Sequence, residues 1–210
     1  MKTLLRISLL VFLSFVLTDC SSTNKFMVQG TEEYSKATSK MLGNWNVSEY
    51  IIDGHNMIGK KYDKMTANFD FPTRKVTFDI WVSKKTIEQK LKDWEEKFPG
   101  IKVDEYKIVY TAKWDVADDI YIYFNDGETN IDIKGGGENF EGFYGWERSK
   151  FEMAKSSDDG SLLGSVVGSV TKAATGTEDL FPDFSYSYVY NVTNNTFTLK
   201  SGDDKIVLVR

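Results

Sequence analysis

The chain has 210 residues, with 26 basic and 31 acidic side chains, and its formal net charge at pH 7 is −5. A mildly acidic chain without a basic cluster argues against nucleic-acid binding, because contacts with phosphates supply much of that affinity. Aromatic residues make up 14% of the chain, which argues against intrinsic disorder and favours a β-rich body.

The N-terminus has the layout of a secretion signal. Lys2 and Arg6 precede an almost wholly apolar stretch, residues 7–17, which ends three residues before Cys20. A helix needs about 20 apolar residues to span a bilayer, and this stretch is roughly half as long. We therefore predict a signal peptide over residues 1–19. Cys20 is the only cysteine of the chain, so it has no partner for an internal disulfide.

Residues 17–20, Leu-Thr-Asp-Cys, resemble the processing site of a bacterial lipoprotein. The resemblance implies that Cys20 is lipidated, becomes the mature N-terminus and joins the protein to a membrane, where each buried methylene contributes about 0.8 kcal/mol. Ser21 stands where an aspartate would retain such a protein at the inner membrane, which favours the outer membrane of a cell envelope. Asp19 departs from the family preference for a small residue. A plain secretory signal and an uncleaved anchor are the alternatives.

Residues 20–40 carry the predicted lipid and form a predicted flexible tether, because they are rich in Ser, Thr, Lys and Glu and poor in apolar residues. A short helical turn is expected within residues 34–41. The first predicted strands follow where apolar and polar residues alternate. They are expected at residues 45–51, 67–71 and 76–82.

Residues 83–98 change to helical periodicity. Ile87, Leu91, Trp94 and Phe98 fall at i, i+4, i+7 and i+11, which places them on one face of a helix. An amphipathic helix is therefore predicted here, inserted between strands. It is expected to end at the Pro-Gly pair that follows.

Alternation then returns and predicts seven further strands. They are expected at residues 106–114, 120–124, 131–133, 140–153, 184–192, 197–199 and 206–209. Residues 156–176 are small and rich in glycine, and form a predicted insertion. It is either a mobile loop, a short helix lying on the barrel, or a lid over a ligand cavity. The number of strands and the spacing of their turns predict an all-β antiparallel barrel or sandwich of about 8–10 strands.

The sequence Met-Leu-Gly-Asn-Trp at the start of the first strand resembles the G-x-W signature of the lipocalins, and more closely the lipocalin-like lipoproteins of bacteria. The resemblance implies a lipocalin-like barrel over residues 41–210. It also implies that Gly43 permits a close turn into the strand and that Trp45 plugs the closed end. A basic residue near the last strand, Arg210 or Lys205, would pack over this tryptophan.

The predicted function is non-enzymatic binding of a small, mostly apolar ligand at the cell envelope, without a cofactor. Aromatic side chains that face inward would line the cavity, and tyrosine hydroxyl groups would orient the ligand. The candidate ligand-binding residues are Trp45, Phe69, Phe78, Tyr110, Tyr186 and Tyr188.

No catalytic or metal site is predicted. His55 is the only histidine and falls in a predicted turn, which disfavours both a catalytic pair with a histidine base and the usual zinc site. One alternative is a surface interaction or adhesion lipoprotein whose barrel is filled by side chains. The other is a carboxylate-based hydrolase. Its acids would come from a cluster around glycines, namely Asp126, Glu128, Asp132, Glu138 and Glu141.

Overall fold

The computed structural model describes residues 25–118, 120–156, 180–182 and 184–210. The predicted signal peptide, Cys20 and nearly all of the glycine-rich insertion lie outside the described residues, so the expectations for them stay predictions. Among the helices of the described ranges, none is both long enough and apolar enough to cross a membrane.

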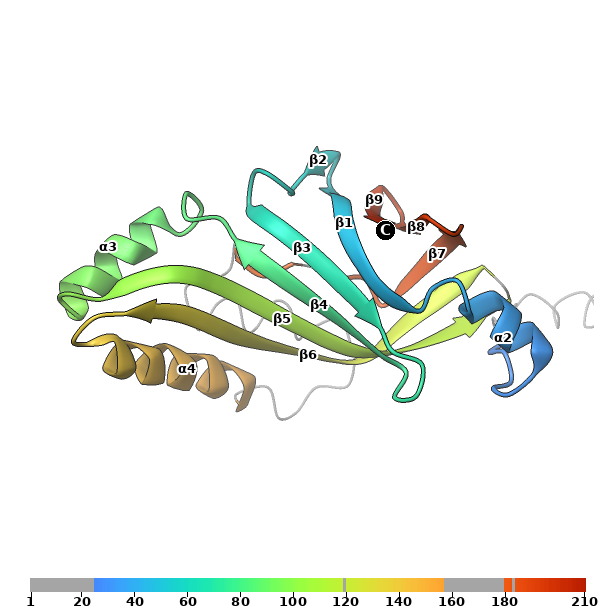
Figure 1. Cartoon of the computed structure of the whole chain (residues 1–210), viewed down its shortest axis with the longest axis horizontal. Coiled ribbons are helices and arrows are strands. Elements are labelled where there is room, and N and C mark those ends of the chain that lie inside the picture. The colour runs from blue at the N-terminus through green and yellow to red at the C-terminus, as the bar shows by residue number, and fades with distance from the viewer. Residues whose placement is uncertain (1–24, 119, 157–179, 183) are drawn as a thin grey trace, which may run out of the picture.

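In this part of the chain, nine strands form one antiparallel sheet in the order β2-β1-β3-β4-β5-β6-β7-β8-β9 (Figure 1). Strand β1 also pairs with β9, so the sheet closes on itself and β2 remains an appendage of β1. The predicted β-rich antiparallel fold is therefore confirmed. The strands are β1 Gly43–Ile52, β2 His55–Asn56, β3 Tyr62–Phe69, β4 Lys75–Val82, β5 Lys102–Ala117, β6 Tyr121–Gly136, β7 Ser187–Val192, β8 Thr196–Ser201 and β9 Asp204–Val209.

Alternation decides which side chains face the interior of this closed sheet. In β4 every second residue is buried, from Val76 to Val82, and the residues between them face outward. The register places Phe78 opposite Ala67 of β3 and Tyr110 of β5. A shift by one residue would turn all of these side chains to the solvent, so burial of the apolar set fixes the register.

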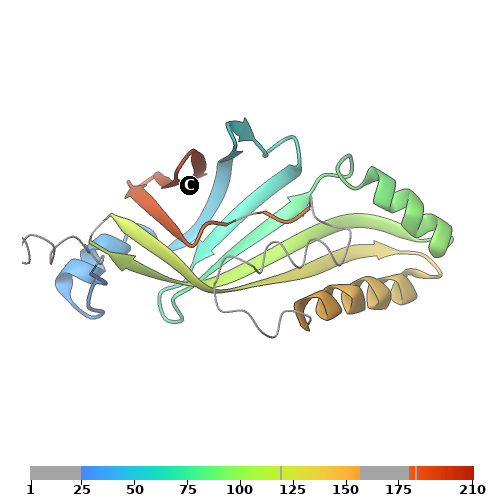
Figure 2. The same ribbon diagram turned by 180° about the vertical axis from the view of Figure 1, so that it is seen from behind.

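Strands β5 and β6 are each 16 residues long and extend beyond their neighbours. Strand β4 pairs only with residues 107–113 of β5, and β7 pairs only with residues 121–123 of β6. Two helices lie along the overhanging half of this hairpin, at the end of the molecule opposite to the third (Figures 1 and 2). The helices are α2 Glu32–Thr38, α3 Glu88–Lys97 and α4 Phe140–Ser156.

Helices α3 and α4 build an aromatic cluster against the overhanging half of the hairpin. Trp94 of α3 stacks on Tyr106 of β5 with 5.8 Å between ring centres, and lies 5.1 Å from the ring of Phe143 in α4. The amphipathic helix predicted over residues 83–98 is therefore present. It begins at Glu88, because the residues just before it form turns.

The strand predicted over residues 140–153 is wrong, since this segment forms helix α4. Phe143, Glu147 and Phe151 are buried and recur at intervals of four residues, which is a helical period. Two glycines in the first turns weaken the helical signal, and a glutamate occupies one of the buried positions. Both features obscure the period in the sequence.

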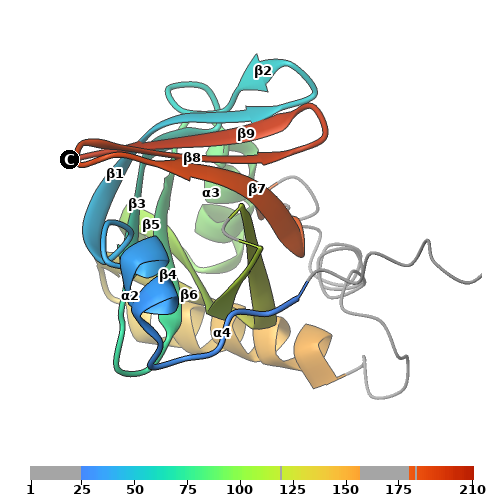
Figure 3. The same cartoon turned by 90° about the vertical axis from the view of Figure 1, so that its right-hand side faces the viewer.

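Part of the predicted tether is folded. Helix α2 is capped by Thr31, whose side-chain oxygen accepts a hydrogen bond of 3.2 Å from the backbone N–H of Tyr34. Tyr34 is buried, and Phe26 forms a β-bridge with Ala117 at the end of β5. Figure 3 shows α2 and the segment before it beside the sheet. Residues 26–40 therefore belong to the folded body and not to a flexible tether.

Candidate functional site

Trp45 of β1 and Arg210, which follows β9, lie in contact beside the seam where these two strands pair. The indole N–H of Trp45 donates a hydrogen bond of 2.7 Å to the carbonyl oxygen of Met41, and only 1% of the side chain is exposed. The guanidinium carbon of Arg210 lies 4.1 Å from the centre of the indole ring, which is a cation–π contact. The same guanidinium donates hydrogen bonds to the backbone carbonyl groups of Lys40 and Leu42.

The two basic residues near the last strand have different partners. Arg210 packs over the tryptophan, whereas Lys205 forms an ion pair of 2.6 Å with Glu49 of β1. Gly43 begins β1 with a φ of +96°, a backbone conformation that side chains with a Cβ rarely adopt. The turn into β1 therefore depends on this glycine.

Phe69 is the centre of a packed aromatic cluster inside the sheet. Its ring centre lies between 5.1 and 6.4 Å from those of Phe78, Trp114, Phe124 and Phe197. These distances are typical of tilted and edge-on aromatic packing. This half of the interior is filled by side chains.

The other half of the interior receives Phe184, which belongs to no strand. Its ring centre lies 4.5 Å from that of Tyr110, 4.6 Å from that of Phe78 and 5.9 Å from that of Tyr50. Figure 2 shows the segment that leads into β7 crossing strands β3, β4 and β5. Phe184 therefore occupies the place where a ligand would meet the inner aromatic side chains.

The described residues of this crossing segment, 180–182 and 184–186, are hydrogen-bonded to inner tyrosines and to β6, where the backbone N–H of Phe124 donates to the carbonyl oxygen of Tyr186 at 2.9 Å. The hydroxyl of Tyr62 donates to the carbonyl oxygen of Leu180 at 3.1 Å. The backbone N–H of Ser185 donates to the hydroxyl oxygen of Tyr188 at 2.7 Å. These are single hydrogen bonds, each with a net contribution of about 1 kcal/mol.

Three tyrosine hydroxyl groups lie in this half of the interior. Burial raises the pKa of Tyr110 to about 12, and burial also raises the pKa of Tyr62 and of Tyr188. The cause is desolvation, which disfavours the phenolate. All three hydroxyl groups are therefore neutral at physiological pH and can both donate and accept hydrogen bonds.

The structure separates the predicted ligand-binding residues into groups. Phe78, Tyr110 and Tyr188 face the interior in the half that holds Phe184, while Phe69 lies in the packed cluster. Trp45 packs against Phe197, a member of the same cluster, with 5.7 Å between ring centres. The expectation that Tyr186 also faces inward is wrong.

Tyr186 points outward, is 52% exposed and packs edge-on against Tyr123, with 5.5 Å between ring centres. It precedes β7, whose first residue is Ser187, so it does not share the alternation that buries Tyr188 and Tyr190. Of the three tyrosines at positions 186, 188 and 190, only the last two are therefore buried.

Sequence reasoning missed Phe184, Tyr50 and Tyr62 as parts of the interior site. Phe184 was expected in a strand over residues 184–192, whereas the strand begins three residues later. Pro182 is a signal that precedes it, since proline disfavours a central strand and marks a break in the ladder.

A second arrangement of interest is the buried acid Glu147 on α4. Its side chain is 5% exposed and is hydrogen-bonded to Tyr106, while its Oε2 atom has no hydrogen-bond partner. Burial raises the pKa of Glu147, and the charges of Lys150 and Lys90, together with the Tyr106 hydrogen bond, act in the opposite direction. An acid with a raised pKa is a candidate proton donor, and it was not among the predicted acids.

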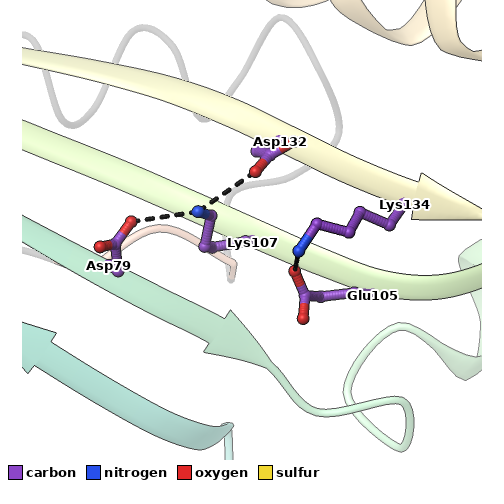
Figure 4. A network of polar contacts seen from close by, with 5 residues as sticks. All are labelled: Asp79, Glu105, Lys107, Asp132 and Lys134. Carbon is purple, nitrogen blue, oxygen red and sulfur yellow. Dashed lines mark hydrogen bonds and ion pairs between the residues drawn. The ribbon is translucent and has the colours of Figure 1, made fainter.

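The outer face of the sheet carries a network of charged side chains (Figure 4). Lys107 of β5 lies between Asp79 of β4, at 3.2 Å, and Asp132 of β6, at 3.1 Å. Beside it, Lys134 of β6 pairs with Glu105 of β5 at 2.8 Å. Cross-strand pairs of this kind contribute roughly 0.2–1 kcal/mol each. The ion pairs join neighbouring strands, and each of the three carboxylates, Asp79, Asp132 and Glu105, has a lysine partner.

Two of the five acids suggested for a hydrolase form ion pairs of the same kind. Asp126 pairs with Lys113 at 2.8 Å, and Asp132 pairs with Lys107. His55 is exposed in the short strand β2. Asp126 and Asp132 are therefore each paired with a lysine of β5.

Two arrangements in the described residues therefore carry polar groups that could bind a ligand or donate a proton. The first is the aromatic interior with neutral hydroxyl groups around Phe184, and the second is the buried pair of Glu147 and Tyr106. Comparison of the chain with known proteins finds no matching family model, no matching curated protein and no matching solved structure.

Proposed function

We propose that the protein is a lipid-anchored, non-enzymatic binding protein of the cell envelope that takes a small, mostly apolar ligand inside a lipocalin-like barrel. The observation that carries the proposal is the position of Phe184. A side chain from an irregular segment lies among Phe78, Tyr110 and Tyr50, where it acts as an internal substitute for a ligand.

The physical argument is an exchange of one apolar group for another. Displacing Phe184 removes ring contacts with Phe78 and Tyr110, and an apolar ligand in the same place would restore them. The neutral hydroxyl of Tyr188, released from Ser185, would then be available for a polar group of the ligand. The favoured ligand is therefore an apolar molecule with one uncharged polar end.

The G-x-W turn supports the lipocalin-like part of the proposal. Gly43 has the positive φ that a close turn requires, and Arg210 covers Trp45 beside the seam where β1 and β9 pair. Both features agree with what the resemblance implies for a ligand-binding barrel. The anchor rests on the resemblance of residues 17–20 to a lipoprotein processing site.

The test is a fluorescence titration with the methyl ester of cis-parinaric acid, an uncharged fluorescent apolar molecule, using the chain without residues 1–20. Phe184→Ala is expected to lower the dissociation constant about tenfold, because the internal competitor is removed. Phe184→Trp is expected to raise it, because a larger side chain fills the site. Phe71→Ala, which truncates an exposed phenylalanine, is the matched control and should leave the affinity unchanged.

Absence of binding in the wild type and in Phe184→Ala would contradict the proposal. That result would favour the second candidate function, a surface interaction lipoprotein with a filled interior. The observation behind this alternative is the unbroken series of ring contacts from Trp45 through Phe197 and Phe69 to Phe78. Native mass spectrometry of protein purified gently from its own envelope distinguishes the two by the presence or absence of a co-purifying apolar molecule.

The anchor is tested separately by growth of the producing cells with radiolabelled palmitate. The wild-type chain is expected to incorporate the label, and Cys20→Ser is expected to lose it, since no other cysteine is present. Label retained by Cys20→Ser would contradict the anchor. This result has no bearing on the titration, so the two parts of the proposal fail independently.

A further inference from the structure

Aromatic and apolar side chains gather on the outer face of β6 and β7, where the alternation of the strands would place polar residues. Phe26, Tyr186 and Val189 are 48%, 52% and 48% exposed. The ring of Tyr123 lies 5.1 Å from that of Phe26 and 5.5 Å from that of Tyr186. We call these four residues the outer aromatic patch.

The register confirms that the patch lies on one face. Val189 is opposite Tyr121, and Tyr123 is opposite Ser187, so Val189 and Tyr123 project from the same side of the sheet. Strand β7 and residues 121–125 of β6 carry no charged side chain. Lys200 of β8 stands opposite Val189 and borders the patch. An exposed aromatic surface of this kind is unusual on a soluble body and indicates a binding surface.

The N-terminal end of the described chain is fixed beside this patch. The backbone N–H of Lys25 donates to the carboxylate of Asp118 at 3.3 Å, and the backbone N–H of Asp118 donates to the carbonyl oxygen of Lys25. Two residues further, the backbone N–H of Met27 donates to the carbonyl oxygen of Val116. The chain thus enters the fold at the end of β5, close to Phe26 (Figure 3).

The length of chain before Lys25 limits the distance to the proposed anchor. Cys20 precedes Lys25 by five residues, which span at most about 18 Å when fully extended. A lipidated Cys20 would therefore hold this end of the sheet close to the membrane surface. The other end, with α3 and α4, would point away from it (Figure 1).

We propose that the outer aromatic patch rests on the lipid surface that holds the anchor, with its rings at the level of the headgroups. This inference rests on the proposed anchor at Cys20 and adds an orientation to it. Tyrosine and phenylalanine favour the interface between water and acyl chains. Lys200, at the border of the patch, would face the anionic headgroups. The anchor holds the protein at the membrane. The patch determines which face of the protein contacts the lipid surface.

The test uses the full, lipidated chain in vesicles of phosphatidylethanolamine and phosphatidylglycerol at 3:1, with part of the lipid brominated on its acyl chains to quench tryptophan. Phe26→Trp places a tryptophan in the patch, and Glu96→Trp places one on exposed α3 at the opposite end. Relative to wild type, at least half of the added emission is expected to be quenched for Phe26→Trp. None is expected to be quenched for Glu96→Trp.

A second substitution tests the patch without changing the probe. Val189→Asp, combined with Phe26→Trp, introduces a charge at an exposed position of β7 and is expected to reduce the quenching at least twofold. Circular dichroism of the same sample reports whether the fold is retained. If the folded double variant is quenched as strongly as Phe26→Trp alone, contact through the patch is contradicted.

The outcomes separate the anchor from the patch. Intact mass spectrometry reports acylation, so a chain without acyl groups contradicts the anchor and with it the membrane orientation. An acylated chain whose added tryptophan at position 26 is not quenched contradicts the patch alone. If that chain also sediments as a dimer in detergent, the patch is an interface between two copies, which equally overturns the proposal.

Discussion

The guanidinium of Arg210 lies 4.1 Å from the ring centre of Trp45, so the last residue of the chain covers the first tryptophan. The contact is possible because β9 pairs with β1, with Val209 opposite Asn46. It joins the two ends of the folded body at the point where the sheet closes. The same guanidinium donates hydrogen bonds to the carbonyl oxygens of Lys40, Leu42 and Asn194, so Arg210 helps to hold β1 and β9 together.

Arg210→Ala is expected to lower the free energy of unfolding by about 1–2 kcal/mol. The substitution removes a cation–π contact and two charge-assisted hydrogen bonds to the carbonyl groups of Lys40 and Leu42. Urea unfolding followed by tryptophan fluorescence measures the change. Lys200→Ala, which removes an exposed positive charge from β8, is the control and should change the stability by less than about 0.5 kcal/mol. Equal effects of the two substitutions would show that only charge is involved.

Two glycine substitutions are expected to act in opposite directions. Gly43→Ala should destabilise the protein by about 1–2 kcal/mol, because φ at this position is +96°. Gly142→Ala should stabilise it by about 0.5–1 kcal/mol, because Gly142 lies inside helix α4 with open space around its Cα. Thermal unfolding of both variants shows whether each substitution raises or lowers the stability of the protein. Destabilisation by both would contradict the helical assignment of this segment.

The strands could be predicted because their signal is local. Alternation along β4 is visible in eight consecutive residues, and its buried half matches the apolar positions. The same reasoning failed at α4, where a buried glutamate and two glycines interrupt the apolar period. Helix α2 was only partly anticipated, because Tyr34 is a single apolar anchor in a polar segment and its burial depends on packing against the folded sheet.

The candidate site was predictable only in part, for a similar reason. Alternation placed Phe69, Phe78 and Tyr110 on one face of their strands, and these residues do face the interior. The position of Phe184 depends on a crossing of the chain over other strands, which no local period encodes. The same limit explains Tyr186, which lies just outside a strand whose start is set by pairing with β6.

Two phenylalanines two residues apart test the interior of the sheet. Phe69→Ala is expected to cost about 3–5 kcal/mol, because the side chain is 1% exposed and contacts four other rings. Phe71→Ala is expected to cost less than about 1 kcal/mol, because its side chain is 45% exposed. Chemical denaturation measures both. Similar losses for the two variants would contradict the inward direction of Phe69.

Glu147 is expected to make stability depend on pH. Burial raises its pKa in the folded protein above the value in the unfolded chain, so the folded state holds the proton more tightly. The contribution of this group to stability is therefore most favourable below the unfolded pKa, near 4.5. It declines as the pH rises through the raised, folded value.

Replacement by glutamine removes this decline, because an amide does not ionise. The free energy of unfolding of the wild type, relative to Glu147→Gln, is expected to fall as the pH is raised from 4.5 toward neutrality. Urea denaturation at a series of pH values measures this difference. Glu141→Gln removes an exposed negative charge from the same helix and is the control. If both substitutions change the pH dependence alike, the cause is net charge and not the burial of Glu147 beside Tyr106.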